Sequence, residues 1–131
     1  MSKLVYSAIR TPDGTILSSV HRHDYVTHTD KNGESYMLDG GLEYQRTSIN
    51  KEPAENISLS IGDPHNKIRE AVTWGSYGKK GNGPLRRVPV SEMSDDHLNA
   101  VVVLPYVHQN IGIVFLDELA YRDLHNIFIK E

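Results

Sequence analysis

The stretch LVYSAIRTPDGTILSSV, residues 4–20, decides the first half of the fold. Two apolar, β-branched runs lie on either side of residues 11–14, Thr-Pro-Asp-Gly. Proline fixes φ at the second position of a turn, and glycine accepts a positive φ at the fourth. We therefore predict a hairpin, with one strand over residues 4–9 and a second strand that begins at residue 15.

The sequence that follows repeats the pattern of strand and turn. The second strand is expected to reach residue 29, a length that requires a bulge or bend near residues 21–24. Residues 30–33, Asp-Lys-Asn-Gly, form the next expected turn. Further strands are predicted over residues 35–38, 42–47 and 57–61. The N-terminal part is thus predicted to be an antiparallel β-sheet with meander topology.

The second half of the chain changes from a period of two to a period near 3.6. Asp63 and Pro64 predict the start of a helix that reaches residue 72 or 74, with a strand as the alternative for residues 71–77. Ser94 is the expected cap of a second helix. The longest helix is predicted over residues 110–125, and within it Glu118 and Arg122 are spaced for an i,i+4 ion pair. The fold class is therefore α+β, an N-terminal antiparallel sheet followed by C-terminal helices, and residues 1–131 are expected to form a single domain.

Composition excludes several kinds of protein. The 131 residues contain no cysteine and carry a formal net charge of −3. Disulfides, thiolate–metal sites and cysteine catalysis are therefore excluded, and a long nucleic acid is a poor partner. The longest apolar run, Ala100–Leu104, is far too short to span a membrane, and the first residues lack the pattern of a secretion signal. We expect a cytoplasmic protein without a membrane partner.

The sequence contains no convincing motif for catalysis or for a metal site. His21 and His23 would lie on one side of a strand at a spacing that can hold a metal, but the next glutamate is Glu34, beyond a turn. The alternatives to a metal site at residues 21–24 are a hydrogen-bonded structural cluster and a histidine and arginine pair that faces an anion. The acids at residues 95, 96, 117 and 118 are predicted to be capping and surface charges of helices rather than a catalytic pair. We predict no catalytic residue, no metal and no cofactor.

The most suggestive stretch is WGSYGKKGNG, residues 74–83. Amides in glycine-rich turns can bind an anion, lysines add charge, and aromatic rings offer faces on which a base can stack. The alternative is a flexible hairpin loop whose tryptophan lies in the core. A second group, Asp-Gly-Gly at 39–41 with Tyr44 and Arg46, could clamp a phosphate or be a glycine turn beside an exposed arginine. The predicted ligand-binding residues are Arg22, Arg46, Trp74, Tyr77, Lys79, Lys80 and Arg86, with Arg22 and Arg46 closing the pocket.

The last predicted helix has a wide apolar face, formed by Ile111, Phe115, Leu116 and Leu119. One small sheet does not cover such a face, so we expect a homodimer or a higher oligomer in which this helix takes part. The alternative is that the preceding helix covers it.

Several strings along the chain resemble a group of small phage and prophage proteins. They are His-Asp-Tyr at 23–25, residues 36–41 with Tyr44 and Arg46, Arg-Glu-Ala at 69–71, Trp-Gly at 74–75, Tyr-Gly at 77–78, residues 88–98, Leu119, Tyr-Arg at 121–122 and Asn-Ile at 126–127. The layout of a sheet followed by helices is also similar to one of the Thoeris anti-defence families. Those phage proteins sequester a cyclic ADP-ribose-type signal as oligomers and do not cleave it.

The resemblance implies a phage-type anti-defence protein that sequesters a nucleotide signal without cleaving it, and hence a small anionic nucleotide as ligand. The alternative is a protein-interaction module that inhibits a host enzyme through an acidic C-terminal helical face. A hydrolase or metal enzyme that uses residues 21–24, and a structural virion part, are further alternatives. The first two differ in shape, because a sponge needs a concave pocket lined by arginine and aromatic side chains, whereas an inhibitor needs a flat or convex patch.

Overall fold

The computed structural model describes residues 2–78 and 80–130 of the chain. It divides into two compact units, Met1–Ile61 and Gly62–Glu131, which we describe one at a time. Strands dominate the first unit, and every α-helix that the described residues form lies in the second. The predicted α+β class, with strands first and helices last, is confirmed.

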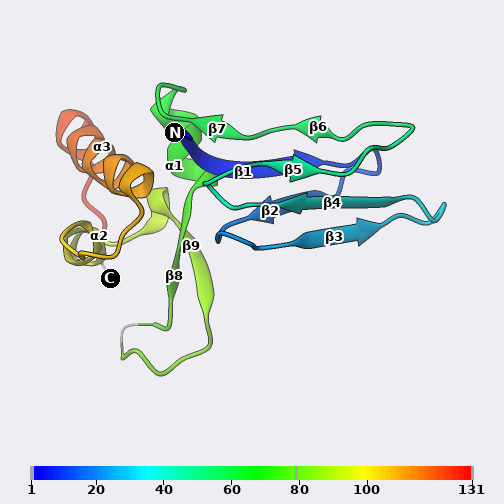
Figure 1. The fold of residues 1–131 in the computed structure, drawn as a ribbon. Helices are drawn as coiled ribbons and strands as arrows, with labels where there is room; N and C mark the ends of the chain where they lie inside the picture. The colour runs from blue at the N-terminus through cyan, green and yellow to red at the C-terminus, as the bar shows by residue number, and fades with distance from the viewer. Residues whose placement is uncertain (1, 79, 131) are drawn as a thin grey trace. The chain divides into compact units, whose positions relative to one another are not determined.

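Strand β1 (Leu4–Arg10) is the centre of the first sheet of Met1–Ile61 (Figure 1). The predicted hairpin is confirmed, since β1 pairs antiparallel with β2 (Ile16–Ser19). The other edge of β1 pairs with β6 (Glu55–Asn56) and then with β7 (Leu59–Ser60), with an irregularity in the register between the two β1 positions Leu4 and Tyr6. The strand predicted over residues 57–61 is therefore reduced to Leu59–Ser60, and β6 lies before the predicted range.

A second sheet holds β3 (Val26–Thr29), β4 (Ser35–Asp39) and β5 (Arg46–Thr47) in antiparallel order. A turn at residues 21–23 separates β2 from β3, so the antiparallel strands form two sheets. In that turn the Ser19 hydroxyl donates to the carbonyl of Asp24, and the Asp24 carboxylate accepts from the amide of Val20. These two bonds hold the bend expected near residues 21–24, which is confirmed, and they divide the strand predicted over residues 15–29 into two.

The core of Met1–Ile61 is small. Its buried centre consists of Ile9, Leu17, Tyr36 and Leu38, with Val26 and Ala54 packed against it. The predicted fourth strand over residues 42–47 is reduced to Arg46–Thr47, because residues 41–43 form a turn. Gly40 sits at φ 115°, and a Cβ atom there would lie 2.1 Å from the carbonyl oxygen of Tyr44, so no larger residue fits this turn.

The unit Gly62–Glu131 begins with helix α1 (His65–Ala71), which is followed by strands β8 (Thr73–Ser76) and β9 (Arg86–Pro89). The short 3₁₀ helix η1 (Val90–Glu92), helix α2 (Asp95–Val102) and helix α3 (Gln109–His125) complete it. The predicted cap of α2 is confirmed, since the Ser94 hydroxyl accepts from the amide of His97 at 3.1 Å. At α1 the expected cap is one residue early, because Pro64 rather than Asp63 occupies the N-cap position.

The core of this unit lies between the helices and the base of the β8–β9 hairpin. Its buried side chains are Ile68, Val72, Val90, Met93, Leu98, Val101, Val114 and Phe115. Phe115 is fully buried, whereas Leu116 is 60% exposed. The wide face predicted for the last helix is therefore wrong in its composition, because Phe115 points into the core while Leu116 points out of it.

The segment after α3 is tied back to the start of α2. Asn126 ends α3 in the left-handed conformation. The amide of Asp95 then donates to the carbonyl of Ile129 at 2.8 Å, and the amide of Ile129 donates to the Asp95 carboxylate at 3.2 Å. Within residues 2–78 and 80–130, no helix is long and apolar enough to cross a membrane.

Candidate functional site

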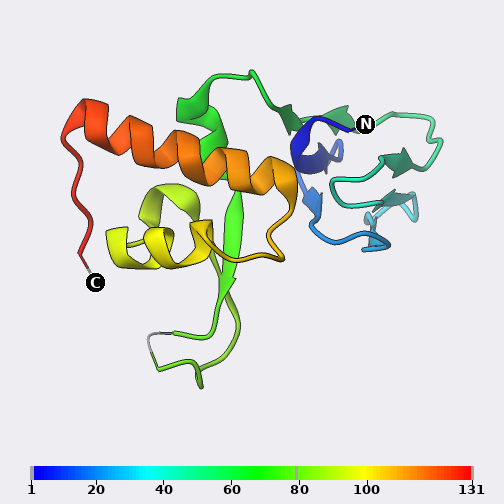
Figure 2. The ribbon, with the colours of Figure 1, turned by 60° about the vertical axis from the view of Figure 1, so that its left-hand side comes forward.

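The hairpin of β8 and β9 carries most of the residues predicted to bind a ligand. Its two strands pair antiparallel, with Trp74 opposite Val88 and Ser76 opposite Arg86. Both alternatives considered for residues 71–77 therefore hold in part, because α1 reaches Ala71 and a strand follows it. Figures 1 and 2 show the hairpin extending away from helices α2 and α3 of its own unit.

The hairpin is a basic element. Between Thr73 and Pro89 the sequence has four lysines and arginines, at 79, 80, 86 and 87, and no acidic residue. Lys80 and Arg86 are exposed. Tyr77 and Leu85 are 55% and 57% exposed and add apolar surface beside those charges. The predicted residue Lys79 lies outside the described residues.

Trp74 and Arg87 make contacts that stabilise the hairpin within its own unit. The Trp74 ring is half-buried and packs edge-on against Phe115, with ring centroids 5.3 Å apart. Arg87 turns back along the hairpin and donates to the hydroxyl and the carbonyl of Thr73, at 3.0 and 2.8 Å. Tyr77 and Arg86 are thus an aromatic and a guanidinium side chain that this hairpin exposes.

Three amides of the glycine-rich loop already have acceptors. The amide of Gly81 donates to the carbonyl of Gly78, and the amide of Gly83 donates to the carbonyl of Tyr77. The amide of Gly78 donates to the hydroxyl of Ser76 at 3.1 Å. These bonds close the loop on itself, so recognition of an anion there would rest mainly on lysine and arginine side chains.

Arg22 and Arg46 belong to the unit Met1–Ile61. Arg22 is exposed in the turn at residues 21–23. Arg46 donates to the buried carboxylate of Asp39 at 2.9 Å, and Tyr44 donates to the same oxygen at 3.2 Å. His23 contacts the Tyr44 hydroxyl through Nδ1 at 3.3 Å. Arg46 is therefore already engaged in an ion pair in its own sheet.

His21 and His23 lie in a turn rather than in a strand, so the spacing argument for a shared face fails. His23 has φ 65°, which only a turn accommodates at low cost. Among residues 2–78 and 80–130, no group of three or more histidine and carboxylate side chains is arranged to hold a metal ion.

A second polar group in the first unit anchors the β1–β2 hairpin. The Asp13 carboxylate accepts from the hydroxyl of Thr11 and contacts Nε2 of His28 at 2.8 Å. These hydrogen bonds, the one from Thr11 first, hold the pKa of Asp13 below its usual range. Thr11 and Asp13 are residues of the turn itself, so we assign this group to the turn and not to catalysis.

A buried ionic cluster in the unit Gly62–Glu131 escaped the sequence analysis. Glu118 has no exposed surface, and its two oxygens accept from Nε and a terminal nitrogen of Arg69, each at 2.9 Å. Nε of Arg122 donates to it at 2.8 Å, and Nε2 of His65 lies 2.9 Å away. The prediction that Glu118 is a surface charge is therefore wrong, whereas its i,i+4 pair with Arg122 is confirmed.

The electrostatics of this cluster favour the ionised pair. Burial alone would raise the pKa of Glu118, but hydrogen bonds from Arg69, Arg122 and His65 outweigh it and hold the pKa below its ordinary value. The same bonds from Glu118 raise the pKa of Arg69, although burial opposes this. Glu118 is therefore ionised at neutral pH, and both of its carboxylate oxygens accept hydrogen bonds from members of the cluster.

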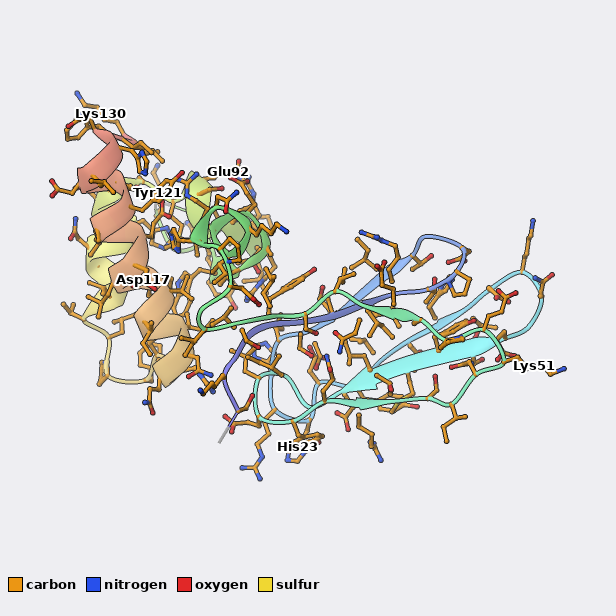
Figure 3. All side chains as sticks on the ribbon, turned by 90° about the horizontal axis from the view of Figure 1, so that it is seen from above. His23, Lys51, Glu92, Asp117, Tyr121 and Lys130 are labelled. Carbon is orange, nitrogen blue, oxygen red and sulfur yellow. The ribbon has the colours of Figure 1, made fainter. Side chains whose placement is uncertain are left out.

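Arg122 also joins several elements of the unit. Its terminal nitrogens donate to the Asp95 carboxylate at 2.8 Å and to the carbonyl of Val90 at 3.0 Å. The Tyr121 ring lies over Arg69 at 4.6 Å, on the side of α3 that faces α1 (Figure 3). The cluster thus fixes α1, η1, α2 and α3 together, and its chemistry is that of a structural network.

A cavity of about 150 Å³ opens in the unit Met1–Ile61. It is lined by uncharged side chains: Ile9, Tyr36, Gln45, Thr47, Ser48, Asn50, Pro53, Ala54 and Asn56. Arg22 and Arg46, the predicted ligand-binding residues of the same unit, are not among its lining residues. Its lining does not match the concave, arginine-lined pocket expected of a nucleotide sponge.

We compared the chain with protein-family models, with curated proteins and with solved structures, and found no match in any of the three.

Proposed function

We propose that this chain acts by non-covalent binding and that the β8–β9 hairpin contacts an acidic surface of a partner protein. The observation that carries this proposal is a projecting hairpin with exposed Lys80 and Arg86, exposed Tyr77 and Leu85, and no acidic residue between Thr73 and Pro89. It corresponds to the interaction module that the sequence analysis weighed, with the hairpin in place of the acidic helical face.

The residue types suit a protein contact. Tyrosine and arginine are enriched among the residues that contribute most to binding energy at protein interfaces, whereas lysine acts at the rim and speeds association. A guanidinium can pair with a carboxylate through two parallel hydrogen bonds. Because Arg86 has no intramolecular ion pair among the described contacts, it can make such a pair without breaking another.

The experiment has two steps. A photo-reactive amino acid at Leu85 first captures neighbouring proteins in the cell of origin, and the captured protein is purified. Calorimetry then compares the wild type with Arg86→Glu, and with Lys67→Glu as a matched control, because Lys67 is exposed on α1 of the same unit. We expect Arg86→Glu to weaken binding at least about tenfold, a loss of about 1.4 kcal/mol, and Lys67→Glu to leave it unchanged.

The proposal fails if no single protein is captured, or if the two charge reversals weaken binding equally. Equal weakening would mean that the interaction responds only to the net charge of the chain and not to the hairpin.

A second candidate function is the capture of a nucleotide signal. It is supported by the exposed ring of Tyr77 on the same hairpin as Lys80 and Arg86, which could stack on a base while the cations bind phosphate. A thermal-shift screen with cyclic nucleotides and ADP-ribose derivatives tests it, since a tight ligand raises the melting temperature. A shift that is lost in the Lys80→Ala/Arg86→Ala variant would favour this candidate over the protein contact.

A further inference from the structure

The cavity of the first unit lies where the two sheets of that unit meet. Ile9 of β1 and Tyr36 of β4 line it and are buried, so they form its floor. Thr47 of β5 and Asn56 of β6 line it and are exposed, so they form its rim. Each of these two strands is the last of its sheet, and the chain between them, residues 48–54, supplies the rest of the lining.

The lining determines the charge of a ligand that could bind in this cavity. Every residue of the lining is uncharged. Three of the side chains carry amides, two carry the hydroxyls of serine and threonine, and the others are apolar or aromatic. A charged group that entered would lose its hydration without gaining an ionic partner. The ligand that fits is therefore uncharged and has both apolar and hydrogen-bonding surface.

Two of the amides, those of Gln45 and Asn56, are held in fixed positions by the protein itself. Nε2 of Gln45 donates to the hydroxyls of Ser7 and Ser58, at 3.1 and 2.7 Å. Oε1 of Gln45 accepts from Nδ2 of Asn56 at 2.9 Å, and Oδ1 of Asn56 accepts from the amide of Ser58 at 3.0 Å. Because these side chains are already ordered, a ligand that binds them loses little affinity to ordering them.

The two amides keep unused hydrogen-bonding capacity side by side. Both hydrogens on Nε2 of Gln45 are donated, but its Oε1 has accepted one hydrogen bond and can accept a second. Among the contacts of the described residues, Nδ2 of Asn56 donates one of its two hydrogens. Since Oε1 and Nδ2 are 2.9 Å apart, they form a neighbouring acceptor and donor. A ligand with an N–H group beside a carbonyl can bond to both at once.

The volume of the cavity limits the ligand to one ring. An apolar cavity of about 150 Å³ holds one benzene molecule, and this cavity has about that volume. A monosaccharide of similar size carries hydroxyls all round its ring, and Asn50 has already donated both amide hydrogens, to Glu34 and to the carbonyl of Ser35. Hydroxyls left without a partner weaken binding, whereas a planar ring needs hydrogen bonds along one edge only.

We propose that this cavity binds an uncharged planar ring that carries an N–H group beside a carbonyl, as a lactam does. In the complex the N–H donates to Oε1 of Gln45, and the carbonyl accepts from Nδ2 of Asn56. The ring itself takes up the space above Ile9 and Tyr36. The site belongs to the unit Met1–Ile61 and is independent of the hairpin, so the failure of either proposal leaves the other intact.

The simplest probe is 2-pyridone, and N-methyl-2-pyridone is its matched control because a methyl group replaces the N–H hydrogen. Each compound is titrated into isotope-labelled protein, and NMR follows the side-chain amide signals of Gln45 and Asn56. We expect saturable shifts with 2-pyridone and at least about tenfold weaker binding of the methylated ring. The absence of saturable shifts would overturn the proposal, and so would equal binding of the two rings or tighter binding of glucose.

Asn56→Asp tests the donor, because it replaces Nδ2 by an oxygen and keeps the shape of the side chain. It should weaken the binding of 2-pyridone at least about tenfold. Asn32→Asp makes the same change at an exposed residue of the same unit outside the lining, and it should leave binding unchanged. Ala54→Leu, at a lining position, should fill the cavity and abolish binding. Backbone signals in the same spectra show that each variant is folded. Equal binding by all three variants would overturn the site.

Uracil and uridine monophosphate separate two sources of such a ring. Uracil should bind at least as tightly as 2-pyridone. Uridine monophosphate should bind at least about tenfold more weakly, because the lining is uncharged and offers its phosphate no ionic partner. Equal affinities would support the ring site and assign the ring to a nucleotide, whereas failure of both to bind would overturn the proposal.

Discussion

The β8–β9 hairpin and the cluster around Glu118 both contain arginine, but it is exposed in the hairpin and buried in the cluster. In the cluster, Arg122 is buried and donates to two carboxylates and a carbonyl. On the hairpin, Arg86 is exposed and has no ion pair among the described contacts. Both lie in the unit Gly62–Glu131, so the difference is one of surroundings and not of residue type.

This difference separates stability from recognition. A buried arginine that is fully hydrogen-bonded has no donor left for a ligand, and removing its partner leaves an unpaired charge in the core. An exposed arginine without a partner adds little to stability and keeps its donors for another molecule. The cluster should therefore control unfolding, and the hairpin should control binding.

The largest effect is expected at the centre of the cluster. Glu118→Gln removes the charge that three cationic or ring donors share, and it should destabilise the unit by about 3–5 kcal/mol. Trp74 is the sole tryptophan and packs on Phe115, so its fluorescence during urea unfolding follows this unit alone. Asp117→Asn, an exposed neighbour, is the control and should change stability by less than about 0.5 kcal/mol. A small effect for Glu118→Gln would remove the contrast between the two regions.

Low pH should cause part of the loss of stability expected for Glu118→Gln. Since the folded state lowers the pKa of Glu118 below 4.5, the unfolded chain takes up the proton first as the pH falls. The contribution of ionised Glu118 to the stability of the fold is complete above about pH 4.5, the ordinary pKa of the group. It is lost as the pH falls through the lowered pKa of the folded state. Unfolding midpoints at about pH 7 and about pH 3 should differ more in the wild type than in Glu118→Gln. Equal differences would assign acid sensitivity to other carboxylates.

An intermediate effect is expected where the hairpin joins the core. Trp74→Ala removes the edge-on contact with Phe115 and should cost about 2 kcal/mol. Tyr77→Ala, three residues further along, should cost less than about 0.5 kcal/mol, because that ring is mostly exposed. Thermal unfolding followed by circular dichroism compares the two. Similar costs would mean that the loop end of the hairpin is as tightly packed as its base.

The smallest effect on stability is expected for the exposed cations. Lys80→Ala/Arg86→Ala should leave the free energy of unfolding within about 0.5 kcal/mol of the wild type, because both side chains are exposed. Urea unfolding followed by Trp74 fluorescence measures this. A clear destabilisation would show that these side chains take part in the fold, and it would weaken their assignment to binding.

The parts of the fold that could be predicted are those set by neighbouring residues. The turn at residues 11–14, the Ser94 cap and the long final helix depend on local backbone preferences, and the structure has all three. The strand predicted over residues 15–29 is divided into β2 and β3, because the Ser19 hydroxyl and the Val20 amide both donate to Asp24 and hold a turn there. A hydrogen bond of that kind is not visible in an alternating pattern.

The candidate site and the buried cluster could also be predicted only where neighbouring residues determine them. The basic character of the hairpin can be counted from the sequence, and the alternative of a core tryptophan was available from the start. The spacing of Glu118 and Arg122 also suggested their pair, but Arg69 and His65 lie 49 and 53 residues from Glu118. No local pattern could bring these side chains together, so a carboxylate that is fully buried was read as a surface charge.

The bonds made by Asp95 also bear on how the protein is synthesised. Its partners Arg122 and Ile129 follow it by 27 and 34 residues. On a ribosome, α2 emerges well before either partner has left the exit tunnel. Arg69 of α1 likewise emerges before its partner Glu118. The early helices of this unit must therefore remain incompletely paired during translation, and their charged side chains find their final contacts only when the last helix is released.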